Sequence, residues 1–99
     1  MMTDWARAAG FLDTVANLLE GMPGMDPDGA IRIALVGHLD VLYDDVARAI
    51  EADHAKTFLS PDSDSLYISD IPPAEAVPAA RAAAERFRSY AQHQDGGAL

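Results

Sequence analysis

Apolar residues recur every three or four positions through the N-terminal segment, as they do along one face of a helix. This stripe consists of Trp5, Ala8, Leu12, Val15, Leu19 and Met22. Thr3 can cap the start of the helix, and Gly21 with Pro23 can end it. Phe11 and Leu18 lie beside the stripe and widen the apolar face. The pattern therefore predicts an amphipathic helix from about Thr3 to Gly21.

A second stripe of the same period consists of Ile31, Leu35, Leu39, Leu42, Val46 and Ile50. Asp26 followed by Pro27 marks a helix start, because proline suits the first helical position. Apolar residues in 30–36 also alternate, which is typical of a strand. We favour one long helix, because the helical period continues through Gly37 without a break.

The next segment changes character. Residues 56–59 (KTFL) and 66–69 (LYIS) are short and rich in strand-forming residues, and turn-forming residues separate them. This pattern predicts a small β-hairpin. After a proline-rich stretch, a further helix is expected from Pro78 to about His93, and residues 93–99 are expected to form a flexible tail. The predicted inner side of this helix consists of Ala80, Ala84, Phe87 and Ala91.

Together these elements predict a mainly α fold: a helical hairpin and a C-terminal helix, with a small β-hairpin between them. A length of 99 residues suits one domain. We therefore interpret residues 1–99 as a single acidic helical domain.

The composition narrows the function classes. The chain has no cysteine, which excludes disulfides, thiol catalysis and cysteine-based zinc sites. Its net charge of −9 should repel nucleic acid and anionic membranes, so direct binding to either is not expected. No signal peptide or membrane-spanning stretch is visible, and the expected location is cytoplasmic.

The negative charge is unevenly distributed. Residues 26–55 hold seven acidic and two basic residues, whereas residues 73–99 hold three of each. Acidic residues are therefore concentrated on the second predicted helix, where they can face a basic partner or simply the solvent.

Two motifs that resemble functional sites lack essential parts. The triplet Asp64-Ser65-Leu66 could place Ser65 as a carrier of a prosthetic group. Strand-forming residues and prolines follow it, where a recognition helix would be required, so we expect a turn. Glu51 and His54 have the spacing of a di-iron ligand pair, but the chain has no second pair. We therefore expect no metal, no cofactor and no catalytic residue.

The function predicted from these features is that of a non-enzymatic interaction or regulatory protein. It would bind a protein partner through an acidic or apolar helical face, and the acidic charge favours a basic partner. The candidate contact residues are Asp40, Asp44, Asp45, Asp53, Trp5 and Phe11.

Two alternatives from other classes stay open. Carboxylates along a helix can imitate a phosphate array, which would suit a phage- or mobile-element-encoded inhibitor that mimics DNA. A small ion-binding or enzymatic protein would instead use Glu51, His54 or Asp45. A homodimer is also expected, because the first helix is apolar over more of its circumference than one neighbour can cover.

Overall fold

The computed structural model describes residues 4–22, 24–37, 42–53, 58–61, 66–68 and 71–97. Within these ranges the chain is mainly helical, with one small antiparallel sheet before the last helix, which confirms the predicted fold class. The elements are α1 (Trp5–Gly21), α2 (Pro27–Gly37), α3 (Leu42–Ala52), β1 (Leu59–Pro61), β2 (Leu66–Ile68), the 3-10 helix η1 (Pro73–Glu75) and α4 (Ala76–Gly97).

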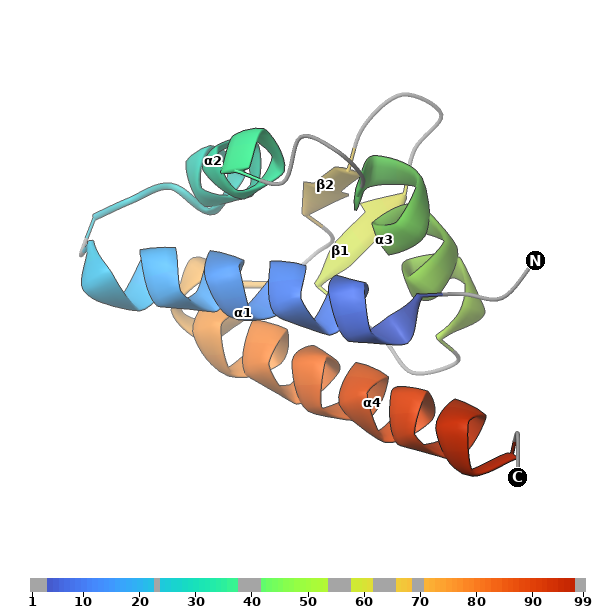
Figure 1. Cartoon of the computed structure of the whole chain (residues 1–99). Coiled ribbons are helices and arrows are strands. Elements are labelled where there is room, and N and C mark those ends of the chain that lie inside the picture. The colour runs from blue at the N-terminus through green and yellow to red at the C-terminus, as the bar shows by residue number, and fades with distance from the viewer. Residues whose placement is uncertain are drawn as a thin grey trace.

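The long helices α1 and α4 lie side by side and form one layer of the molecule (Figure 1). On the opposite side of α1 lie α2, α3 and the β-hairpin. Because α1 contacts α2, α3 and α4, it forms the centre of the fold. None of the described helices is both long enough and apolar enough to cross a bilayer.

Local sequence explains both ends of α1. Asp4 caps its start, since the Asp4 carboxylate accepts a hydrogen bond of 3.1 Å from the backbone N–H of Arg7. The cap is thus Asp4 and not the expected Thr3. The helix ends at Gly21, as predicted, and the N–H of Met22 donates to the carbonyl of Leu18.

The prediction of one long second helix is wrong. α2 ends at Gly37 and α3 begins at Leu42, and the axes of the two helices point in different directions (Figure 1). Glycine is a poor helix former, so little local preference opposes the end of α2 there. Both helices pack against α1, and Leu39, in the middle of the predicted stripe, lies outside the described residues. The segment 30–36, for which a strand was the alternative, is helical.

The predicted β-hairpin is confirmed. β1 and β2 pair antiparallel, and Ser60 lies opposite Tyr67. Side chains alternate between the two faces of a strand. Leu66 is accordingly buried, whereas the neighbouring Tyr67 faces solvent. Ser65 lies outside the described residues.

The last helix is longer than predicted at both ends. It starts at Ala76, two residues before Pro78. Proline is tolerated in the first turn of a helix, because the N–H that it lacks would have no helical partner there. It continues to Gly97, so residues 93–97, which were assigned to a flexible tail, are helical. Gln92, His93 and the two following residues contain no helix breaker.

The core is made largely of small side chains. Among the described residues, half of the buried apolar side chains are alanines, including Ala80, Ala83 and Ala84 of α4. Such small residues let helices approach closely. The bulk of the core comes from a few fully buried side chains: Phe11, Phe58, Phe87, Leu12, Leu59, Val15 and Val46.

Candidate functional site

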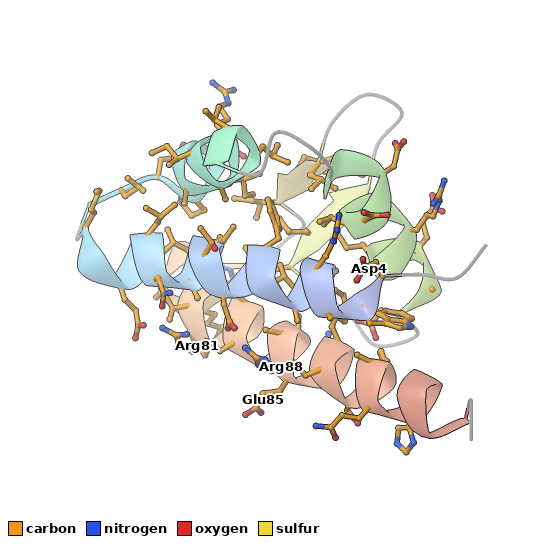
Figure 2. The ribbon with its side chains drawn as sticks, in the orientation of Figure 1. Asp4, Arg81, Glu85 and Arg88 are labelled. Atoms are coloured by element: carbon orange, nitrogen blue, oxygen red, sulfur yellow. The ribbon has the colours of Figure 1, made fainter. Side chains whose placement is uncertain are left out.

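The basic residues of α4 are used within the fold. Arg81 and Arg88 extend from α4 along the line where it meets α1 (Figure 2). Both form salt bridges with Asp13, and Arg81 also bonds to Glu20 and Asn17. These pairs are exposed, so each stabilises the fold by about 0–1 kcal/mol. Their larger consequence is that the α1–α4 layer has little net charge to offer a partner.

A second ionic contact joins the end of α3 to α4 and is buried. Asp53 directly follows α3, and its side chain is fully inaccessible to solvent. One carboxylate oxygen accepts a hydrogen bond of 2.9 Å from Arg86, and the other accepts one of 2.9 Å from the Tyr90 hydroxyl. Asp53 was expected to face a partner. That expectation does not fit the structure, because both carboxylate oxygens have internal donors.

An aromatic cluster lies beside this contact. The ring centroid of Trp5 is 5.2 Å from that of Phe87 and 4.7 Å from that of Tyr90, in tilted and edge-on geometries that aromatic pairs favour. Trp5 is partly buried by this packing. Phe11 is completely buried and cannot contact a partner while the protein is folded. Both residues were candidates for partner contact. The burial of Phe11 speaks against that role, whereas Trp5 is only partly buried and its contact with a partner stays a prediction.

The bond to Asp53 raises the pKa of Tyr90, because the carboxylate accepts a hydrogen bond from the neutral phenol, and burial and the negative charge of Asp53 act in the same direction. The phenol therefore binds its proton more tightly in the folded than in the unfolded chain. The contribution of this contact to the free energy of unfolding is therefore fully present below pH 10, and it is lost as the pH rises through the pKa of Tyr90 in the folded chain. We expect urea unfolding to show a steeper alkaline loss of stability in wild type than in Tyr90→Phe. Equal slopes would contradict this account.

Acidic residues lie in the first turns of two helices. Asp44 and Asp45 lie in the first turn of α3 and Asp28 lies in the first turn of α2, where carboxylates interact favourably with the helix dipole. Asp28 and Asp44 are exposed and Asp45 is partly exposed, and none of the three forms a salt bridge within the described residues. Asp40 lies outside the described residues. These carboxylates stabilise helix starts and also leave negative charge on this side of the molecule.

The described residues include no group of three or more histidine, aspartate or glutamate side chains that could hold a metal ion. Glu51 is exposed on α3, and His54 lies outside the described residues. An ion-binding pair of Glu51 and His54 is therefore not tested by the structure.

The surface feature that sequence reasoning missed is apolar. Ile33 and Val36 on α2 are 48% and 65% exposed, and Tyr67 on β2 is 47% exposed. Ile33 and Val36 are three residues apart and so share one helix face. Since α2 contacts β2, the three side chains belong to neighbouring elements, and we call them the α2–β2 surface. The sequence contained a signal for it, because Ile33 and Val36 lie off the stripe that forms the core.

The reason given for a homodimer does not hold. The first helix was expected to have more apolar surface than one neighbour can cover, but it has three helical neighbours, α2, α3 and α4, and its large apolar residues are buried or partly buried against them. Met22, at 50% exposure, is the exception next to the helix end. Dimerisation itself stays a prediction that sedimentation at physiological salt would measure.

Comparison with protein-family models, with curated proteins and with solved structures found no match to this chain.

Proposed function

We propose that this protein is a non-enzymatic interaction protein that binds a basic protein partner through the α2–β2 surface. The observation that carries the proposal is the exposure of Ile33, Val36 and Tyr67 on two neighbouring elements of a chain with a net charge of −9. Single exposed apolar residues are ordinary on protein surfaces. Ile33 and Val36 share one face of α2, and Tyr67 lies on the strand that contacts this helix, so two adjoining elements expose large apolar side chains that an interface could bury.

The size of α2 suits such an interface. At 1.5 Å per residue its 11 residues extend over about 16 Å. Ile33 and Val36 lie in its second half and would supply the anchoring contacts. Tyr67 would add an aromatic ring whose hydroxyl can remain in contact with water, as is common at the edges of interfaces.

Charge supports a basic partner. Arg81, Arg86 and Arg88 are engaged with carboxylates of α1 and with Asp53. On the α2 and α3 side, the described residues from 26 to 52 hold five acids against two arginines, Arg32 and Arg48, which leaves a negative surplus there. A negative field around an apolar centre speeds association with a positively charged protein and disfavours acidic ones. The cluster of Asp53, Arg86 and Tyr90 holds helices together, which supports a structural rather than a chemical role for those groups.

Affinity capture from cells of the native host tests the proposal. A partner bound by wild type should be lost when Ile33→Ser and Val36→Ser are combined. Serine and the apolar residues it replaces have similar helix propensities, so α2 should remain folded. Binding of the partner to the wild-type protein should weaken as salt is raised, because the charges that attract the partner are exposed.

Ala82→Ser on α4 is the matched control, since it places the same hydroxyl on an exposed helical position far along the chain. Circular dichroism should show equal helix content in all three proteins. A partner that binds the double variant as tightly as wild type, or binds more tightly in high salt, would contradict the proposal.

A further inference from the structure

An open cleft of about 530 Å³ lies where the end of α1, the turn into α2 and the start of α4 meet. Its lining contains five apolar side chains and one carboxylate: Leu19, Met25, Pro27, Ala74, Val77 and Asp26. This volume is within the range of sites that hold small ligands or a few side chains of a peptide. None of the residues of the α2–β2 surface lines it, so the cleft is a separate site.

The walls of the cleft are held by local structure. Gly24 has a φ of 91°, a left-handed conformation that favours glycine, and it lets the chain turn sharply between the helices. The N–H of Met25 donates to the carbonyl of Met22 across this turn, at 2.9 Å. Pro27 then starts α2 with a fixed φ. The turn and the start of α4 lie at the same end of the molecule (Figure 1).

Among the described residues that line the cleft, Asp26 is the charged one. Asp26 is exposed and forms no salt bridge within the described residues. Arg81, one helical turn after Val77, is paired with Glu20 and Asp13. Two further exposed acids directly neighbour lining residues in the chain, Asp28 after Pro27 and Glu75 after Ala74, and they too lack a salt bridge in the described part. An occupant that matches the cleft is therefore apolar on one side and cationic on the other.

We propose that this cleft binds a short peptide segment in which a medium-sized apolar side chain lies next to a lysine or arginine. The apolar side chain packs on Leu19, Met25 and Val77, and the cation bonds to the Asp26 carboxylate. This goes beyond the partner surface proposed above, because it is a second site with its own chemistry.

Methyl NMR of the full chain tests the proposal with a defined probe, the acetylated and amidated peptide Leu-Lys-Leu-Lys. We expect saturable shifts of the methyl signals of Leu19, Met25 and Val77 at millimolar peptide. The matched peptide Leu-Glu-Leu-Glu should bind at least tenfold more weakly, because it places carboxylates beside Asp26. Shifts that do not saturate, or equal binding of the acidic peptide, would overturn the proposal.

Protein variants separate the cleft from other surfaces. Asp26→Asn should weaken Leu-Lys-Leu-Lys binding several-fold, and it preserves the helix start because asparagine is also favoured there. Glu85→Gln, which removes an exposed carboxylate on the outer side of α4 (Figure 2), should leave binding unchanged.

The double variant Ile33→Ser and Val36→Ser should also bind the peptide normally. Loss of peptide binding in that variant would show that the peptide binds at the α2–β2 surface, and it would contradict the proposal that the cleft is the binding site. If the double variant binds both the peptide and the captured partner as tightly as wild type does, the proposed function is rejected and the proposal of the cleft as a peptide site is retained.

Discussion

Replacing Phe11 with alanine is expected to lower the free energy of unfolding by about 3–5 kcal/mol. Phe11 is completely buried beside other core residues of α1, so the change removes a large apolar side chain and leaves a cavity. Half of the described core residues are alanines, whose short side chains cannot move in to fill such a space. Urea unfolding followed by circular dichroism would measure the loss.

Met22→Ala is the control for Phe11, because Met22 is half exposed near the end of the same helix. Its effect should be well below that of Phe11→Ala. A loss of less than about 1 kcal/mol for Phe11→Ala would show that the side chain is outside the core, and it would restore Phe11 as a candidate for partner contact.

The second large effect concerns the buried carboxylate. Asp53→Ala is expected to cost about 3 kcal/mol, at the low end of the range for breaking a buried ion pair, because Arg86 keeps 27% of its side chain exposed. The variant leaves the guanidinium of Arg86 and the hydroxyl of Tyr90 without this acceptor. Glu85→Ala, on the exposed side of α4, should change stability by no more than about 0.5 kcal/mol.

A double variant identifies the origin of the Asp53 effect. If the loss of the Asp53 carboxylate beside the buried part of Arg86 causes the effect, Asp53→Ala combined with Arg86→Met should be more stable than Asp53→Ala alone, since methionine fills similar space without a charge. Equal effects of Asp53→Ala and Glu85→Ala would contradict a structural role for the contact between α3 and α4.

Local pattern was sufficient for the elements but not for their arrangement. The period of three and four residues identified α1 and most of the core side of α4, because each helix buries one face. The same period continues across the end of α2, so it could not reveal that Gly37 and Leu42 belong to two helices with different directions. Tertiary packing against α1 decides that break.

The candidate site was harder to predict, because burial depends on residues far along the chain. Asp53 directly follows a helix, and an aspartate in such a place is usually exposed. Its partners Arg86 and Tyr90 come 33 and 37 residues later in the chain. The exposure of Ile33 and Val36 was easier to predict from the sequence. Once the segment is taken as a helix, the core stripe leaves both residues on the outside.

Side-chain footprinting of the captured complex with hydroxyl radicals tests the central claim most directly. Tyr67, Ile33 and Val36 are all exposed in the free chain and can be labelled, and the exposed His93 on α4 provides an internal reference. The account predicts that labelling of Tyr67, Ile33 and Val36 falls on binding while that of His93 is unchanged. Undiminished labelling of the three residues, with protection along α1 and α4 instead, would contradict it.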